Sequence, residues 1–223
     1  MSFTDRYKTA ADLPARLPVF PLPGALLLPR SQLPLNIFEP RYLQMVSDAM
    51  SGSRLIGMIQ PEDEKSDLLG RPGLCKVGCA GRITSFAETP DSRILVQLTG
   101  IARFRIVSEL VTVTPYRQVE ADFEPYAEDL ETDRGQDEVD RDGLLKTFRD
   151  YLDANNLKAD WEQVRSASNE TLVNTLSLLA PYSARDKQAL LEAHDLKTRA
   201  DVLVALTEMA LARQLGGSQT RLQ

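Results

Sequence analysis

The chain has 223 residues, of which 43% are hydrophobic and 26% charged, and its formal net charge is −6. This composition is typical of a globular protein, and no apolar run reaches the roughly 20 residues that a membrane-spanning helix needs. The N-terminal stretch shows no apolar core of a secretory signal, and two cysteines without such a signal favour reduced thiols. We therefore expect a cytoplasmic protein with one large domain or two small ones.

The first predicted elements lie in a proline-rich segment, "LPVFPLPGALLLPRSQLPLNIFEPRY", which holds six of the thirteen prolines. Proline removes a backbone donor and is confined to the edges or ends of strands. The aliphatic density nevertheless predicts burial. We expect "LPVFPL" and "ALLLP" to be short edge strands of a small twisted barrel, with a turn at Gly24 and with Val19 and Leu27 in the core.

A helix and several strands follow. Pro40 suits the first position of a helix, with Glu39 before it and Gly52 after its end. Strands are predicted from the apolar or alternating runs 54–60, 93–99, 100–107, 110–114 and 116–123. In "GIARFRIV", the alternation places Phe104 on the buried face, with Arg103 and Arg105 on the solvated one.

In the second half, the apolar residues recur at the spacing of helices rather than that of strands. Residues 124–142 carry nine acids and two bases, which indicates a solvated, mobile spacer. Four helical patterns follow in "GLLKTFRDYLDANN", "NETLVNTLSLLAP", "SARDKQALLEA" and "KTRADVLVALTEMALARQLGG". The predicted fold class is therefore α+β: a β-rich part at 1–123 with one helix, an acidic linker at 124–142 and a helical bundle at 143–215.

The order of these motifs resembles the amino-terminal substrate-binding domain of Lon proteases. The similarity rests on "LPVFPLPGALLLPRSQLPLNIFEPRY", then on "RLIGMIQP", "CKVGCAGRI" and "LTGIARFRI", and finally on the helical stretch with "DKQALLEA". The resemblance implies a PUA-like pseudo-barrel followed by a helical bundle, and a role in recognising protein substrates. Full Lon proteases continue into an ATPase module and a peptidase domain, which this sequence does not contain, so we expect a free-standing member of the family.

The motif "FEPRY" supplies the candidate binding residues Phe38, Glu39, Arg41 and Tyr42. Two interpretations stay open for its charged pair. Charges among apolar neighbours must be paired or solvated, so Glu39 and Arg41 can form a structural ion pair that orients the helix. Alternatively, the motif forms one rim of a polypeptide-binding surface.

Motifs for catalysis are not found in the sequence. Gly52 and Gly57 have the glycine spacing of a phosphate-binding loop, but Met58 follows where lysine is required. His194 is the single histidine and lies at a predicted helix end, where a structural role is expected. Cys75 and Cys79 lack the further ligands of a zinc site, so we expect thiols, no metal and no cofactor. The sequence predicts a protein that is not an enzyme.

The expected partner is an unfolded or extended polypeptide, with a protease or a chaperone as a further partner in protein quality control. An RNA-binding PUA-like module is the alternative. It rests on the arginines of the β-rich part (Arg82, Arg93, Arg103, Arg105 and Arg117), which lack the interleaved aromatic residues of single-stranded RNA sites. A solvated strand face is the favoured explanation of these arginines, so nucleic acid is disfavoured as a partner.

Overall fold

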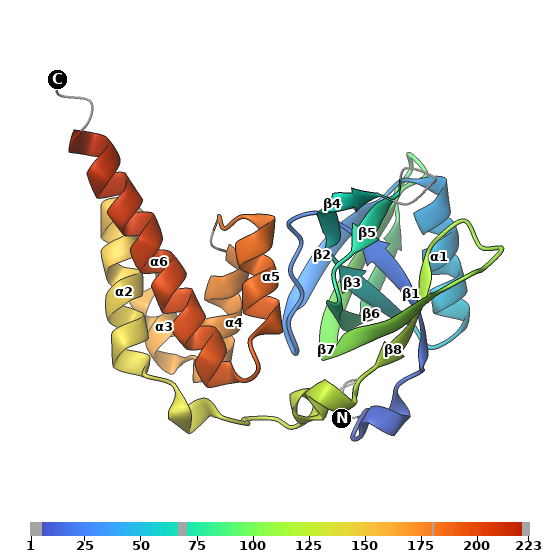
Figure 1. Ribbon diagram of the computed structural model, residues 1–223, viewed down its shortest axis with the longest axis horizontal. Helices are drawn as coiled ribbons and strands as arrows, with labels where there is room; N and C mark the ends of the chain where they lie inside the picture. Colours follow the sequence, from blue (N-terminus) through green and yellow to red (C-terminus); the bar gives the residue numbers. More distant parts are fainter. Residues whose placement is uncertain (1–5, 67–70, 180, 220–223) are drawn as a thin grey trace. The chain divides into compact units, whose positions relative to one another are not determined.

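The computed structural model describes residues 6–66, 71–179 and 181–219 (Figure 1). Its internal contacts divide the chain into two compact units. The first, here called the β unit, runs to Thr132 and includes Ser183–Leu191. The second, the helical unit, comprises Asp133–Tyr182 and the residues from Glu192 onward.

The β unit is built on a six-stranded sheet in the order β2-β7-β6-β3-β1-β8. β8 pairs with β1 on one side and with β7 on the other, so five strands close into a ring and β2 extends from β7 outside it. A second, two-stranded sheet joins β4 to β5. The bounds are β1 Arg16–Pro21, β2 Gln32–Ile37, β3 Leu55–Ile59, β4 Pro61–Ser66, β5 Pro72–Leu74, β6 Val77–Glu88, β7 Ile94–Leu110 and β8 Gln118–Asp122. The predicted β-rich pseudo-barrel is confirmed, as a strand ring with one strand outside it.

The proline-rich segment forms the interior strand β1, a loop that crosses β7, and the edge strand β2. β1 lies between β3 and β8, so the prediction of an edge strand is wrong for its first half. The "ALLLP" run is not a strand, because the chain there crosses β7 at Gly100. Arg30 N donates to the Gly100 carbonyl at 2.8 Å, and Gly100 N donates to the Ser31 carbonyl at 2.9 Å. Val19 and Leu27 are nevertheless fully buried, as predicted.

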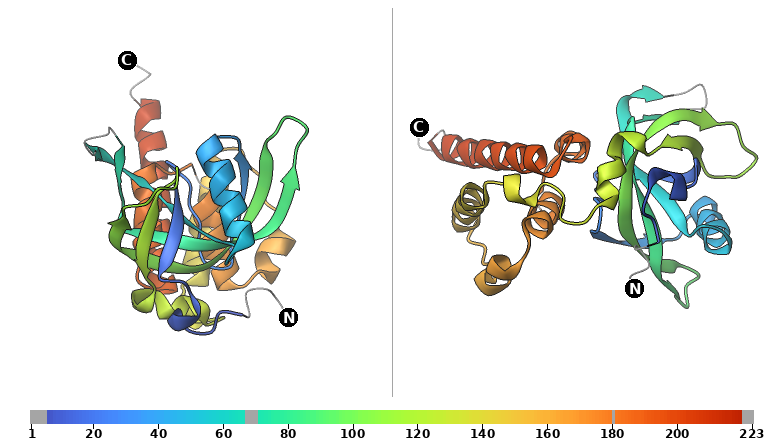
Figure 2. Two further views of the ribbon diagram at one scale, coloured as in Figure 1. Left: turned by 90° about the vertical axis from the view of Figure 1, so that its right-hand side faces the viewer. Right: turned by 90° about the horizontal axis from the view of Figure 1, so that it is seen from below.

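The predicted helix is α1, Pro40–Ser51, which begins at the proline and ends before Gly52. Its buried face is formed by Tyr42, Met45, Val46 and Ala49. The ring of Tyr42 packs against Phe20 of β1, with 4.2 Å between the ring centroids. Figure 2 shows α1 beside the long β6–β7 hairpin, which projects beyond the rest of the sheet.

The prediction that the arginines of the strands are solvated is wrong for two of them. Arg82 is buried and donates to the Tyr7 hydroxyl at 3.0 Å and to the Ser53 carbonyl at 3.1 Å. Arg103 is buried and forms an ion pair with Asp129 at 2.8 Å. At Arg103 the strand alternation fails because a carboxylate from a later segment covers the polar face.

That carboxylate belongs to the acidic segment, which is therefore not solvated throughout. Its first part folds into the 3-10 helix η2, Glu124–Leu130, and buries Asp129. The remainder includes the short η3, Gln136–Glu138, and exposes most of its charged side chains. Two further short elements complete the β unit. They are the N-terminal η1, Ala10–Asp12, and residues 184–191 of α5, whose bounds are Ala184–Glu192.

The helical unit contains α2, Arg141–Ala154, α3, Trp161–Ser166, α4, Asn169–Leu179, and α6, Leu196–Gln219. The helices predicted from the four helical patterns are present, and α3 is an additional short helix. Asp160 caps α3 by accepting from the backbone N–H groups of Glu162 and Gln163. Between α4 and α6, Arg199 donates to Asn174 at 3.1 Å in a buried contact. None of the helices among the described residues is long and apolar enough to span a bilayer.

Candidate functional site

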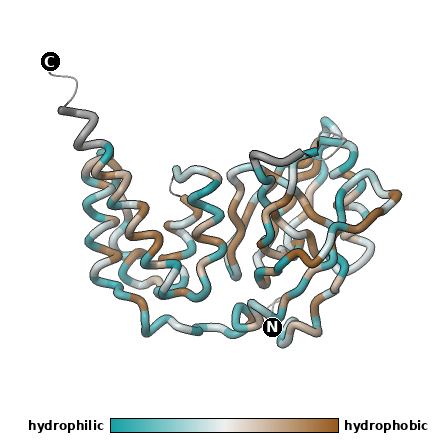
Figure 3. Tube along the Cα trace, in the orientation of Figure 1, coloured by the Kyte–Doolittle hydropathy of each residue, from teal (hydrophilic) through white to brown (hydrophobic). Residues whose placement is uncertain are grey.

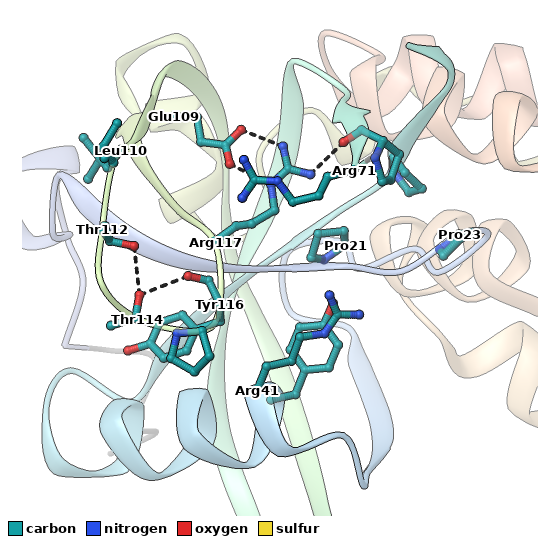
Figure 4. Close-up of a pocket in the computed structure, with 15 residues that line it drawn as sticks. Pro21, Pro23, Arg41, Arg71, Glu109, Leu110, Thr112, Thr114, Tyr116 and Arg117 are labelled. Atoms are coloured by element: carbon teal, nitrogen blue, oxygen red, sulfur yellow. Dashed lines mark hydrogen bonds and ion pairs between the residues drawn. The ribbon is translucent and has the colours of Figure 1, made fainter. Parts of the chain in front are cut away.

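A cleft with a volume of about 560 Å³ lies in the β unit and includes two of the candidate residues, Arg41 and Tyr42 (Figure 4). The end of β1 and the turn after it contribute Pro21 and Pro23, and the start of α1 contributes Arg41 and Tyr42. The rest of the wall comes from the β4–β5 pair and from the β7–β8 connection. Those residues are Pro61, Arg71, Pro72, Glu109, Leu110, Val111, Thr112, Thr114, Pro115, Tyr116 and Arg117.

The prolines lie where β1 loses one of its neighbours. β1 pairs with β8 only over Arg16–Pro18, and Val19 N then donates to the Arg117 carbonyl at 2.9 Å. Backbone groups alternate along a strand, so the backbone of Pro21 faces the same side as that of Val19. Beyond Val19, this side of the strand borders the cleft. Proline at position 21 lets the strand continue there without an exposed N–H group.

Arg41 is held in place by two neighbours. Its Nη2 lies 2.8 Å from Glu39 Oε2, and its Nε donates to the same oxygen at 3.0 Å. Its guanidinium lies over the Tyr42 ring, 4.5 Å from the centroid. The predicted ion pair is therefore present, but its side chains are 51% and 42% exposed rather than enclosed by apolar groups. An exposed pair of this kind contributes about 0–1 kcal/mol to stability.

The opposite wall of the cleft is fixed by Arg117. Its Nε and Nη2 donate to both carboxylate oxygens of Glu109, at 2.8 and 2.6 Å, and its Nη1 donates to the Pro72 carbonyl at 2.7 Å. This side chain therefore joins the loop before β8 to β7 and to β5. Figure 4 shows Arg117 and Arg71 on one side of Pro21 and Arg41 on the other.

Between β7 and β8, residues 111–117 form a loop with two different faces. Thr112 and Thr114 share a hydrogen bond at 2.9 Å, and Thr114 also donates to the Tyr116 carbonyl at 3.0 Å. Val111 and Val113 alternate with these threonines and are fully exposed. The tip of this loop projects from the β unit and is coloured as hydrophobic (Figures 2 and 3). We call Val111 and Val113 the valine strip.

Tyr116 ties the loop to α1. Its hydroxyl donates to Asp48 Oδ2 at 2.6 Å. Burial and then this hydrogen bond favour the protonated phenol and raise the pKa of Tyr116 to about 12. The loop is thus anchored from its inner side, and the valine strip is exposed on an ordered backbone.

The other candidate residues do not line the cleft. Glu39 is outside the cleft wall and forms the ion pair with Arg41. Phe38 is exposed, and its ring lies 5.7 Å from the Arg93 guanidinium carbon. The sequence predicts a strand over 110–114 and therefore does not reveal the valine strip; this prediction is wrong beyond Leu110, where β7 ends. The strict Val-Thr alternation of this stretch was the available signal.

Residues with catalytic potential are distributed elsewhere. His194 is exposed, and its Nδ1 lies 3.6 Å from Asp195 Oδ2. Cys75 and Cys79 are thiols that form no disulfide. Within the described ranges, no group of three or more His, Cys, Asp or Glu side chains is placed to hold a metal ion.

The helical unit has a second cavity, also of about 560 Å³, between α2, α3, α4 and α6. Its wall is mainly apolar and includes Phe148, Tyr151 and Leu176. Tyr182 and Thr207 share a hydrogen bond of 2.6 Å at this wall. This unit therefore presents an apolar hollow, in contrast to the charged cleft of the β unit.

Comparison with known proteins identifies the class of the domain. Residues 16–208 match the family described as the ATP-dependent protease La (LON) substrate-binding domain. Because this match covers most of the chain, the protein belongs to that family.

The similar proteins include Lon proteases. The Lon protease of Flavobacterium johnsoniae is 26% identical over 193 residues, which cover 85% of this chain and 23% of the relative. That of Desulfosudis oleivorans is 28% identical over 200 residues, which cover 86% of this chain and 23% of the relative. The chain thus spans about a quarter of the length of these relatives, and the match is confined to the substrate-binding domain.

Two solved structures share the fold. A Lon N-terminal domain protein from Xanthomonas campestris has a TM-score of 0.62 and 25% identity, and the match covers 85% of this chain and 97% of that one. The N-terminal domain of a Mycobacterium avium complex Lon protease has a TM-score of 0.64 at 18% identity, with coverages of 86% and 98%. The predicted resemblance to the Lon amino-terminal domain is confirmed.

Proposed function

We propose that this chain is a non-catalytic polypeptide-binding module, and that its cleft and valine strip capture extended segments of unfolded proteins. The observation that carries the proposal is the ordered 111–117 loop, which exposes two valines beside a cleft at the open side of β1. Exposed apolar side chains on an anchored backbone favour binding of apolar side chains from a partner. Membership of the Lon substrate-binding family supports the same conclusion.

The proposed partners are unfolded polypeptides, and a protease or chaperone that receives them. An adaptor role in protein quality control and a cytoplasmic location stay predictions, as does the PUA-like assignment. The RNA-binding alternative is not carried forward, because two of the five arginines on which it rested are buried in internal hydrogen bonds.

Binding to a labelled polypeptide that cannot refold tests the proposal. Reduced, carboxyamidomethylated ribonuclease A is a suitable probe, with fluorescence anisotropy as the readout. The double variant Val111→Ser/Val113→Ser should weaken binding about tenfold, because two valines would no longer be buried against the ligand. Val107→Ser is the matched control, since Val107 is an exposed valine on β7 that does not line the cleft.

Equal binding by the double variant and the wild type would show that the valine strip is not the capture surface. The non-catalytic part of the proposal has a separate test. The purified chain should neither hydrolyse ATP nor cleave the unfolded probe, and turnover that persists through repurification would contradict it.

A further inference from the structure

We propose that Arg41 recognises a carboxylate, so that the cleft prefers extended segments in which acidic side chains alternate with aliphatic ones. This inference rests on the proposed function and names its substrate class. It is carried by the unused donors of Arg41, by the charges on the cleft walls and by the two-residue period of the valine strip.

The guanidinium of Arg41 is only partly used within the chain. A single oxygen of Glu39 interacts with both Nε and Nη2 of Arg41. The Tyr42 ring packs against one face of the guanidinium. Among the described residues, Nη1 of Arg41 makes no hydrogen bond or ion pair. The contacts with Glu39 and Tyr42 already restrict the conformations of the Arg41 side chain. A ligand carboxylate that binds the other side of the guanidinium therefore causes only a small further loss of side-chain entropy.

The described walls of the cleft carry more positive than negative charge. They contain Arg41, Arg71 and Arg117, and a single acid, Glu109. Glu109 is already engaged by both of its oxygens with Arg117. Arg41 lies on one side of Pro21 and the other two arginines lie on the opposite side, so positively charged groups are present on both sides of that residue (Figure 4). This distribution suits several acidic side chains along a segment better than one terminal carboxylate.

The valine strip adds a second requirement. Successive side chains of an extended segment point to opposite faces, so every second residue meets the same surface. A segment that places aliphatic residues against Val111 and Val113 places the intervening residues on its other face. Acidic residues at those positions would meet the guanidinium groups.

A pair of synthetic peptides tests this specificity. Both are labelled, amidated and flanked by Gly-Ser, and they differ only in alternating Val with Glu or with Gln. In anisotropy titrations of the full chain at low salt, the Val–Glu peptide should bind about tenfold more tightly, as expected for charge-assisted hydrogen bonds. The difference should shrink as salt screens the exposed charges.

Variants of the chain assign the preference to Arg41. Arg41→Gln should remove the difference between the two peptides, whereas Arg105→Gln should leave it intact, because Arg105 is exposed on β7 outside the cleft. Glu39→Gln should tighten binding of the Val–Glu peptide severalfold, because it removes the internal carboxylate that competes for Arg41. A purely structural pair would not produce that gain.

The outcomes separate the inference from the proposed function. If both peptides bind with equal affinity while the unfolded ribonuclease probe still binds through the valine strip, the carboxylate preference is overturned and the proposed function is not. An equal loss with Arg105→Gln has the same consequence, because it would indicate general electrostatic attraction. The same two peptides made with a free C-terminus are a further control. If only these free-acid peptides bind tightly, the cleft recognises a terminal carboxylate, and the proposed preference for acidic side chains is overturned. Failure to bind any of the three probes overturns both the inference and the proposed function.

Discussion

Gly100 of β7 lies where the "ALLLP" run crosses the strand, and the two backbones are in direct contact. A Cβ atom at this position would lie 2.0 Å from the Leu28 carbonyl oxygen, which is a backbone atom that cannot swing aside. Gly100→Ala should therefore lower the free energy of unfolding by about 2–4 kcal/mol, measured by denaturant titration. Gly24→Ala is the control for backbone strain alone, because Gly24 has φ +71° and open space around it. Gly24→Ala should lower the free energy of unfolding by about 1 kcal/mol. Equal losses of stability in the two variants would contradict a steric clash between residue 100 and the Leu28 carbonyl.

Arg103 and Asp129 form the most enclosed ion pair described in the β unit. Asp129 accepts from the Arg103 backbone N–H at 2.9 Å and from its Nε and Nη2, each at 2.8 Å. Burial disfavours the charged guanidinium, but the hydrogen bonds and charge of Asp129 outweigh it and raise the pKa of Arg103.

Removing one partner of this pair leaves a buried charge unpaired. Asp129→Ala should therefore cost about 3–5 kcal/mol in the free energy of unfolding. The double variant Arg103→Met/Asp129→Leu should recover much of that loss, because no unpaired charge remains. A double variant as unstable as the single one would show that the pair is not the source of the cost.

Tyr116 gives the β unit a specific response to alkaline pH. Its phenol has a pKa of about 12 in the folded chain, against an ordinary value of 10.0. The folded state therefore holds the proton more tightly. This contribution to stability is complete below about pH 10 and is lost as the pH rises towards 12.

Tyrosine absorbance during a pH titration should accordingly show a late phase near pH 12, and Tyr116→Phe should remove it. Burial also raises the pKa of Tyr42, so Tyr42→Phe serves to separate the two contributions. An unchanged late phase in Tyr116→Phe would show that the Asp48 hydrogen bond does not hold the proton.

The acidic segment behaves as two elements, and this division predicts where a protease acts. Residues 124–130 are packed as η2, whereas most side chains at 131–138 are exposed. The two units also divide between Thr132 and Asp133. Arg134 is the one basic residue in 124–140, so limited trypsin digestion should cut first after Arg134. Arg134→Gln should delay this cut, as mass spectrometry would show; first cuts within 17–60 would contradict it.

The elements that the sequence predicted well are those fixed by local rules. Proline at a first helical position and glycine beyond the end located α1, and alternation located β7. Prediction failed where distant segments decide the outcome. The crossing at Gly100 makes a loop of an aliphatic run, and a carboxylate 26 residues further along the chain buries Arg103. In the candidate site, the motif supplied Arg41 and Tyr42, but the opposite wall comes from residues 109–117, which no local pattern connects to them.

At the scale of the whole molecule, α5 is the element whose sequence position and structural membership differ most. It lies between two helices of the helical unit, yet residues 183–191 belong to the β unit. Gln60 donates to the Ala184 carbonyl at 2.9 Å, Lys187 donates to the Gly24 carbonyl at 3.0 Å, and Gln188 donates to the Val77 carbonyl at 3.1 Å.

These bonds predict a shared stability. In native-state hydrogen exchange, the amides of α5 should exchange together with those of β3 and β6 rather than with those of α4 and α6. Gln60→Ala should increase exchange in α5 and in the neighbouring strands. Protection of α5 that follows α4 and α6 in all conditions would contradict its membership of the β unit.

The membership of α5 also has a consequence for synthesis on the ribosome. The strands of the β unit are complete by Asp122, but its last contacts require residues 183–191. Arg103, for example, donates to the Leu191 carbonyl at 3.2 Å, a contact across 88 residues. During synthesis, the strand ring therefore lacks its contacts with residues 183–191 until most of the chain has emerged from the ribosome. During this interval its apolar surfaces can meet other chains, including those that the finished protein is proposed to bind.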